Sequence, residues 1–228
     1  MWLIDSSIGR KLVMSVSGLA LILFLTFHMA MNAVALFSPE GYNMVCEFLG
    51  ANWYALVATI GLAALVVVHI VYAFILQVQN LRARGNQRYA VTAKPKGVEW
   101  ASQNMLVLGI IVVGFLVLHL SDFWSKMQLV ELCEKMGAHC EHQFDPKDGA
   151  ALLVHNFSQW WRVALYAVWL AALWFHLTHG FWSALHTLGW NNKNWISRLQ
   201  CISNWYTTIV VLGFIAVPIY YLVKSLIA

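Results

Sequence analysis

The chain contains five stretches without Asp, Glu, Lys or Arg that are long enough to cross a lipid bilayer. They run over residues 12–38, 48–81, 100–121, 163–192 and 199–223. A helix needs about 20 apolar residues to cross the hydrocarbon core of a membrane. An open sheet is excluded there because lipid cannot satisfy its edge hydrogen bonds. We therefore predict five transmembrane helices, at about residues 11–38, 52–81, 100–123, 158–187 and 199–225.

The composition agrees with a membrane bundle and not with a water-soluble domain. Of the 228 residues, 61% are hydrophobic and only 11% are charged, whereas about a quarter are charged in ordinary soluble domains. Arg10 and Lys11 precede the first apolar stretch as they would in a signal peptide, but a secretory apolar region spans only about 7–15 residues. We expect an all-α membrane protein with one domain over residues 1–228, its first helix retained.

The distribution of Lys and Arg predicts the orientation. Five spans place the amino terminus on the same side as the loops near residues 82–99 and 188–198. That side holds nine of the 14 basic residues and two of the 10 acidic ones, so its formal charge is 9 − 2 = +7. Basic loops remain in the cytoplasm, so we predict a cytoplasmic amino terminus. Such a face also attracts anionic membrane lipid and offers a docking surface for a soluble partner.

Four of the apolar stretches each contribute a histidine at one of two matched depths. His28 and His119 lie in the predicted outer halves of their helices, and we call them the outer pair. His69 and His176 each lie about 5 Å to the cytoplasmic side of their helix centres, at 1.5 Å of rise per residue, and we call them the inner pair. Polar side chains at membrane depth face the bundle interior and mark functional sites.

Two pairs of histidines at two depths are what two b-type haems need, because a low-spin haem iron takes one imidazole on each axial side. Gly18 precedes His28 by ten residues and Gly109 precedes His119 by ten. A glycine lets a macrocycle or a neighbouring helix approach the backbone. The alternatives are interhelical hydrogen bonding, proton conduction and binding of another metal. Covalent haem attachment is excluded because the chain has no C-x-x-C-H motif.

The layout and the motifs resemble a known family. The five helices, the order of the four histidines and the segment FHLTHGFW (residues 175–182) together resemble the di-haem cytochrome b anchor of succinate:quinone oxidoreductases and quinol:fumarate reductases. The resemblance covers nearly the whole chain, and its most specific part is His176-x-x-x-Gly180 followed by Leu188-Gly189. It implies two non-covalent haem b groups, with His69 and His176 as proximal ligands and His28 and His119 as distal ligands.

The resemblance also suggests residues around the haems. Ser15 matches a family position that binds a haem propionate, and we expect more propionate donors or neighbours among Arg10, Lys11, Ser102, His179 and Arg162. His186 is a candidate propionate or quinone contact, or a solvated interfacial histidine. Trp174 stands where some relatives carry a glutamate linked to proton movement, so that route is not expected here.

The same resemblance implies the function and the partners. The chain would pass electrons between menaquinone or another quinone and an iron–sulfur subunit on its cytoplasmic face, in a bacterial cytoplasmic membrane. A flavoprotein subunit beyond it would interconvert succinate and fumarate. We expect no nucleic-acid partner and no dehydrogenase activity from this chain alone. Glu47 and Glu40, between the first two helices, are the candidate proton-exchanging groups of an outer quinone site, with His186 as an inner alternative.

Two other functions are compatible with the same pattern. One is the cytochrome b subunit of a hydrogenase or formate dehydrogenase, and the other is a proton or ion transporter that uses the histidines as relays. The polar segment 122–149 contains Cys133 and Cys140, which would form a disulfide or remain free thiols on the outer side.

Overall fold

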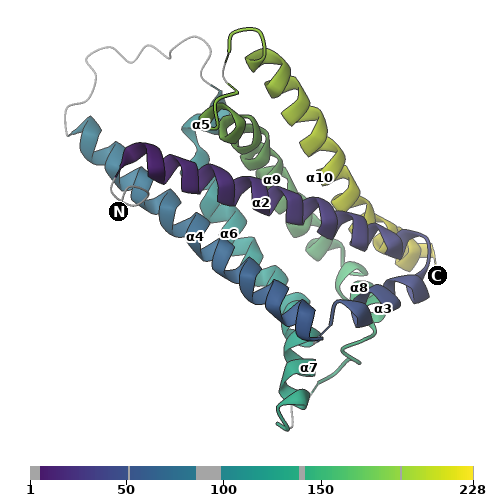
Figure 1. Ribbon diagram of the computed structural model, residues 1–228. Coiled ribbons are helices and arrows are strands. Elements are labelled where there is room, and N and C mark those ends of the chain that lie inside the picture. Colours follow the sequence, from purple (N-terminus) through teal and green to yellow (C-terminus); the bar gives the residue numbers. More distant parts are fainter. Residues whose placement is uncertain (1–5, 51, 86–98, 139–141, 191, 228) are drawn as a thin grey trace.

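Five long helices form the body of the molecule. The computed structural model describes residues 6–50, 52–85, 99–138, 142–190 and 192–227, and its regular structure over these residues is helical throughout. The helices long and apolar enough to cross a membrane are α2 (Ser7–Ala33, extended by the 3-10 turn η1, Val34–Leu36), α4 (Trp53–Arg84), α6 (Met105–Asp122), α9 (Trp160–Thr187) and α10 (Ile196–Ile227) (Figure 1). The prediction of an all-α, multi-pass membrane protein with five spans is confirmed.

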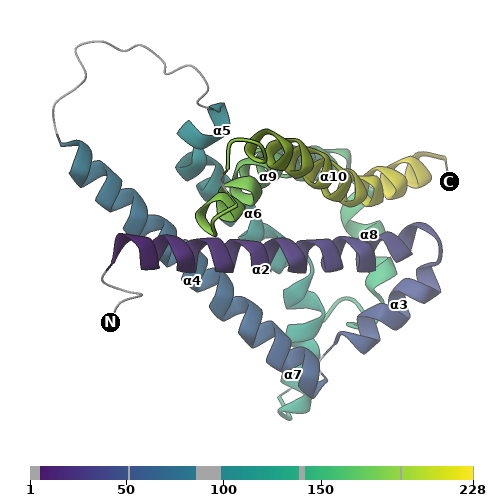
Figure 2. The same ribbon diagram turned by 45° about the horizontal axis from the view of Figure 1, so that its top comes forward.

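Shorter helices connect the spans. They are α3 (Pro39–Phe48), α5 (Trp100–Gln103), the 3-10 turn η2 (Trp124–Lys126), α7 (Gln128–Lys135) and α8 (Gly149–Phe157). The start of α2 and the end of α10 lie at opposite ends of the bundle, which we call the amino-terminal and carboxyl-terminal ends (Figure 1). Figures 1 and 2 show α3, α7 and α8 gathered toward the carboxyl-terminal end, whereas α5 lies near the amino-terminal end. From the sequence, α3, α7 and α8 were expected to be loops, whereas α5 was counted within the predicted span at residues 100–123.

Local capping explains where the first helix begins. The Ser6 hydroxyl accepts a hydrogen bond from the Gly9 amide at 2.9 Å, as serine does at helix N-caps. The helix therefore starts at Ser7 and includes Arg10 and Lys11, several residues before the predicted start. Helix α4 ends at Arg84, and the next residue, Gly85, adopts a φ of 66°, which glycine allows without strain.

Helix α9 is the centre of the bundle, because α2, α6 and α10 all pack against it. Ile22 of α2 and Leu170, Leu173 and Leu177 of α9 form a buried cluster between these helices. Helix α4 packs along α2 instead, and Ala55 is its one buried residue among those the structure describes. The face of α4 that looks into the bundle is therefore little covered by protein.

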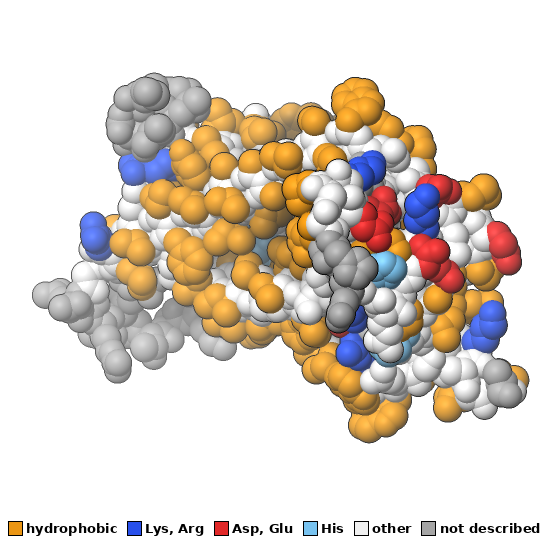
Figure 3. Space-filling model, turned by 90° about the horizontal axis from the view of Figure 1, so that it is seen from below, with side chains coloured by type: hydrophobic (Ala, Val, Ile, Leu, Met, Phe, Trp, Pro, Cys, Tyr) orange, Lys and Arg blue, Asp and Glu red, His pale blue; other side chains and the backbone are white. Residues whose placement is uncertain are grey.

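The surface shows a hydrophobic band between two polar ends (Figure 3). Hydrophobic side chains cover the middle of the molecule in this view, and acidic side chains gather at the carboxyl-terminal end. Large apolar side chains such as Leu23, Ile60 and Ile209 are more than half exposed. Such a band matches the hydrocarbon core of a bilayer.

Candidate functional site

The four membrane histidines face one another in two pairs, each across two helices. The ring centres of His28 (α2) and His119 (α6) lie 5.8 Å apart, with an angle of 86° between the ring planes. Those of His69 (α4) and His176 (α9) lie 6.5 Å apart at 67°. The structure thus brings together the rings that helix depth paired in the sequence.

This spacing fits one metal ion between the two rings of each pair. With a metal–nitrogen bond of about 2 Å and about 1 Å from the nitrogen to the ring centre, two imidazoles on opposite sides of one ion have centres about 6 Å apart. Among the described residues, no group of three or more His, Cys, Asp or Glu is placed to hold a metal. Structural zinc takes four protein ligands, whereas haem iron needs only the two axial ones. The donor set therefore fits haem better than zinc.

In α2 and in α6, ten residues separate a glycine beside the inner pair from the histidine of the outer pair. We call the depths of the two pairs the inner and outer levels. A Cβ atom placed on Gly18 would lie 3.3 Å from Cε1 of His69, and one on Gly109 would lie 3.7 Å from Cε1 of His176. Gly18 thus makes room for the His69 ring, Gly109 lies in ordinary contact range of the His176 ring, and each helix reaches its outer-pair histidine ten residues later. Ten helical residues rise about 15 Å. Helices α2 and α6 therefore independently give the same distance between the inner and outer pairs along the helix axis.

A serine hydroxyl contacts the ring of His69. Ser17 is 3% exposed, and its Oγ lies 3.0 Å from His69 Nδ1. The same oxygen donates to the Met14 carbonyl oxygen at 3.0 Å. The sequence analysis did not single out Ser17, because only the crossing of α2 and α4 brings it to a residue 52 positions away.

Aromatic side chains surround the outer pair. His28 stacks on Phe24 at 5.4 Å between ring centres and also contacts Phe214 of α10. His119 contacts the rings of Phe123, Tyr166 and Trp169. Asn32 Nδ2 donates to the His28 carbonyl oxygen at 2.8 Å and lies 3.4 Å from its Nε2.

A buried ion pair lies one helical turn beyond His119. Arg162 donates to Asp122 and to Asn156, both at 2.6 Å, and the Tyr166 hydroxyl donates to the second Asp122 oxygen at 3.0 Å. The side chains of Asp122 and Arg162 are 6% and 20% exposed. The sequence analysis named Arg162 but missed Asp122, although the spacing His119-x-x-Asp122 places both residues on one helix face.

Several buried nitrogen atoms in the helices of the two pairs have no hydrogen-bond partner among the described residues. They are Nδ1 of His119, Nδ1 of His176, Nε of Arg162 and Nε1 of Trp169. An unpaired buried polar group costs about 1–3 kcal/mol, so a native bundle rarely holds several. Arg162 and Trp169 contribute N–H donors near the outer pair, which suits a ligand that carries acceptor oxygens.

The other predicted site residues have varied positions. His179 does not join the inner pair: its Nδ1 lies 3.2 Å from Glu99 Oε2, to which Trp182 also donates. His186 is exposed at the end of α9. Ser15 is buried, Arg10 is partly buried, and both Lys11 and Ser102 are exposed at the amino-terminal end.

Both candidate carboxylates of the outer quinone site lie at the surface. Glu47 pairs with Lys147 at 2.9 Å, and both side chains are more than half exposed. Contact with the Glu47 carboxylate raises the pKa of Lys147. Glu40 is exposed and accepts a hydrogen bond from Ser38. Cys133 is a free thiol in α7, while Cys140 and most of the basic loop, residues 86–98, lie outside the described residues.

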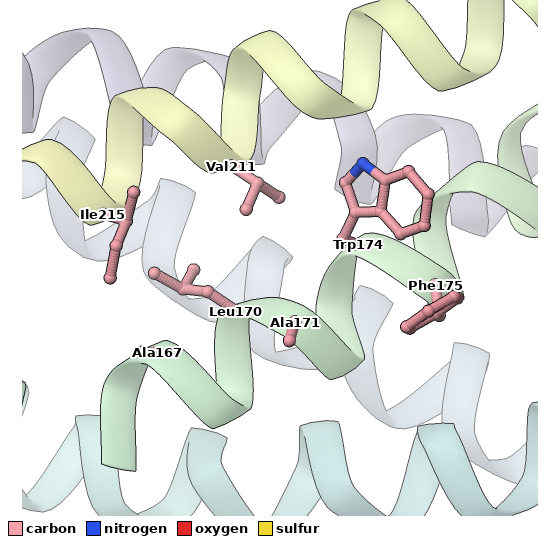
Figure 4. A pocket seen from close by; sticks show the side chains of 7 residues that line it. All are labelled: Ala167, Leu170, Ala171, Trp174, Phe175, Val211 and Ile215. Atoms are coloured by element: carbon pink, nitrogen blue, oxygen red, sulfur yellow. The ribbon is translucent and has the colours of Figure 1, made fainter. Parts of the chain in front are cut away.

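A shallow apolar groove follows the contact of α9 and α10 (Figure 4). It has a volume of about 270 Å³ and is lined by side chains of both helices, with Trp174 at one end and Ile215 near the other. The indole of Trp174 donates to Thr208 at 2.9 Å, so its one polar atom is satisfied within the protein. The groove is apolar and shows no feature that selects a ligand over a lipid chain.

No family model, no curated protein and no solved structure matches this chain.

Proposed function

We propose that the protein is the membrane-anchor cytochrome b of a succinate:quinone oxidoreductase or quinol:fumarate reductase. In this proposal it holds two haem b groups and carries electrons between a membrane quinone and an iron–sulfur subunit. The observation that carries the proposal is the two facing histidine pairs on four different helices, at levels about 15 Å apart.

The packing of the helices supports a bulky group inside the bundle. Helix α4 meets α9 through the His69–His176 ring pair, yet it packs along α2 and buries only Ala55 among the described residues. The face of α4 that carries His69 looks into the bundle interior, so we expect a further group to pack against it. A large apolar macrocycle would supply that cover and would use both histidines as axial ligands.

The residues of the chain would have distinct tasks. The four imidazoles bind and orient the two groups, while the apolar helices keep water away from them. A bound haem supplies one-electron redox chemistry at each level. Ser15 and Arg10 lie near the amino-terminal end and would donate to propionates of the inner group, with Lys11 and Ser102 closer to water. The unpaired Nε of Arg162 is a donor toward the outer group.

The orientation and the partners follow from charge. The side with the formal charge of +7 includes Arg10 and Lys11, which lie at the amino-terminal end, so that end faces the cytoplasm by the positive-inside rule and receives the iron–sulfur subunit. The outer end then holds the quinone site. Glu47 and Glu40 are exposed there, so each can exchange protons with bulk water.

The test is one preparation of the protein purified with its bound subunits. We expect a reduced-minus-oxidised spectrum of haem b, an iron–sulfur and a flavin-containing subunit, and quinone-linked succinate or fumarate turnover. A nickel-containing partner would replace the proposal with a hydrogenase anchor. Absence of any haem spectrum would favour a histidine-based transporter. Glu47→Gln and Glu40→Gln, assayed with quinone and with a soluble dye, test the two carboxylates.

A further inference from the structure

The hydroxyl of Ser17 is placed to decide which nitrogen of His69 carries its proton. Ser17 is buried in α2, adjacent in sequence to the glycine that makes room for the His69 ring. Its Oγ lies 3.0 Å from Nδ1 of His69 and 3.0 Å from the carbonyl oxygen of Met14. The contact joins α2 and α4, the two helices that pack along each other.

The number of protons at Ser17 determines the direction of each bond. A serine hydroxyl has one proton to donate and can accept from other donors. The Ser17 hydroxyl donates to the Met14 carbonyl oxygen, which uses its one proton. In this arrangement the oxygen of Ser17 is an acceptor toward His69, and Nδ1 of His69 is the donor. Neutral imidazole carries a single N–H, so Nε2 keeps a free lone pair.

We propose that Ser17 is a positioning residue that holds His69 in the Nδ1–H tautomer and so prepares Nε2 to bind iron. This inference rests on the proposed haem-binding function and deepens it. Neither Nδ1 of His119 nor Nδ1 of His176 has a hydrogen-bond partner among the described residues. The inner pair therefore joins one oriented imidazole, His69, with one that lacks such a partner, His176.

A hydrogen-bonded ligand is a stronger electron donor to its metal. An acceptor at the second nitrogen raises the basicity of the imidazole, and loss of such a partner changes metal affinity by about 10–100-fold. A more basic ligand favours ferric over ferrous iron. Removal of the Ser17 hydroxyl should therefore weaken the preference for the ferric state about tenfold, which raises the midpoint potential of the inner haem by about 59 mV.

The experiment compares three variants in the purified complex by redox titration of both haems. Ser17→Ala removes the hydroxyl, and Ser17→Thr retains one. Thr178→Ala is the matched control, because Thr178 is also buried and its hydroxyl donates to the carbonyl of Phe175 in its own helix. The inner haem is identified as the one absent from a His176→Ala variant.

We expect two haems in all three variants, a higher potential for the inner haem alone in Ser17→Ala, and a return toward the wild-type value in Ser17→Thr. Unchanged potentials in Ser17→Ala, or an equal shift in Thr178→Ala, would overturn the assignment. A second readout does not depend on haem: ¹⁵N-histidine NMR of the protein should show Nδ1–H at His69, and loss of that preference in Ser17→Ala. If the wild-type protein held no haem, the proposed function would fail, and the NMR result would still decide the role of Ser17.

Discussion

The inner and outer histidine pairs share the same ligand type but have different surroundings. His69 and His176 lie against Gly18 and Gly109, and His69 is held by a neutral hydroxyl. The outer pair is enclosed by aromatic rings and lies beside the buried Asp122–Arg162 ion pair. The inner pair is therefore surrounded by small residues and a hydrogen bond, and the outer pair by aromatic side chains and an ion pair.

This difference predicts that the two sites respond to different changes. A hydrogen bond to an imidazole tunes a metal locally, whereas a buried ion pair couples several helices and is costly to break. Changes near the inner pair should alter the properties of its haem with little loss of protein stability. Changes at the ion pair should alter stability first.

The largest effect is expected from removing the histidines. His69→Ala or His176→Ala should remove the inner haem alone, and His28→Ala or His119→Ala the outer haem alone, because each iron loses an axial ligand. His179→Ala is the matched control on α9 and should keep both haems, since its ring contacts Glu99. Haem content per polypeptide measures this. Retention of both haems in His176→Ala with loss of one in His179→Ala would contradict the pairing.

The next largest effect concerns the ion pair beside the outer pair. Asp122→Asn should lower the free energy of unfolding by about 3 kcal/mol, because it leaves the partly buried Arg162 without its counter-charge. Glu99→Gln, near the amino-terminal end and partly exposed, should cost less than about 1 kcal/mol. Thermal unfolding in one detergent compares them. An equal loss of unfolding free energy in Asp122→Asn and Glu99→Gln would show that the ion pair beside the outer pair does not stabilise the protein more than the contacts of Glu99 do.

A smaller effect is expected at the glycines of the inner level. Gly18→Ala should strain the His69 ring, because the new Cβ would lie 3.3 Å from it, whereas Gly109→Ala should be tolerated, because 3.7 Å from His176 is an ordinary van der Waals contact. Gly114→Ala on α6 is the control, because its Cβ would meet nothing within 4 Å. Overpacking costs about 1–3 kcal/mol, so we expect the affinity for the inner haem to fall in Gly18→Ala and to stay close to the wild-type value in Gly109→Ala. An equal effect from Gly114→Ala would show that the contact with the rings is not the cause.

The smallest effect tests the packing of α3 against α8 at the carboxyl-terminal end. Burial raises the pKa of the Cys46 thiol to about 11. Only the thiolate reacts with maleimides, so the labelling rate of Cys46 should keep rising about tenfold per pH unit from pH 8 to 10. A Cys46→Ser variant controls for the other thiols. A rate that levels off below pH 9 would mean that α3 and α8 leave this thiol exposed.

The helix count and the matched depths of the histidines could be predicted from the sequence because both follow from local chemistry. A charge-free stretch of sufficient length predicts a span by itself, and helical rise converts residue position into depth. The starts of α2 and α10 were predicted a few residues late. In α2 the reason is that Arg10 and Lys11 limited the charge-free stretch, although Ser6 caps the helix before them.

The surroundings of the pairs could not be predicted because they depend on how the helices cross. Gly18 precedes His28 in the sequence, yet it lies against His69 of another helix. Ser17 and Asp122 gain their partners from α4 and α9. Glu47 was a candidate group of an outer quinone site, and its carboxylate pairs with Lys147 at the surface. Each of these contacts joins residues far apart in the chain, which no local pattern reveals.

The central claim is that each histidine pair holds one haem. The most direct measurement is the number of haem b groups per polypeptide in the purified wild-type protein, from the pyridine haemochrome spectrum and quantitative amino-acid analysis. We predict two haem groups, both low-spin and both released by denaturation, because no covalent attachment motif is present. A value of zero, or a single haem that survives replacement of either pair, would contradict it.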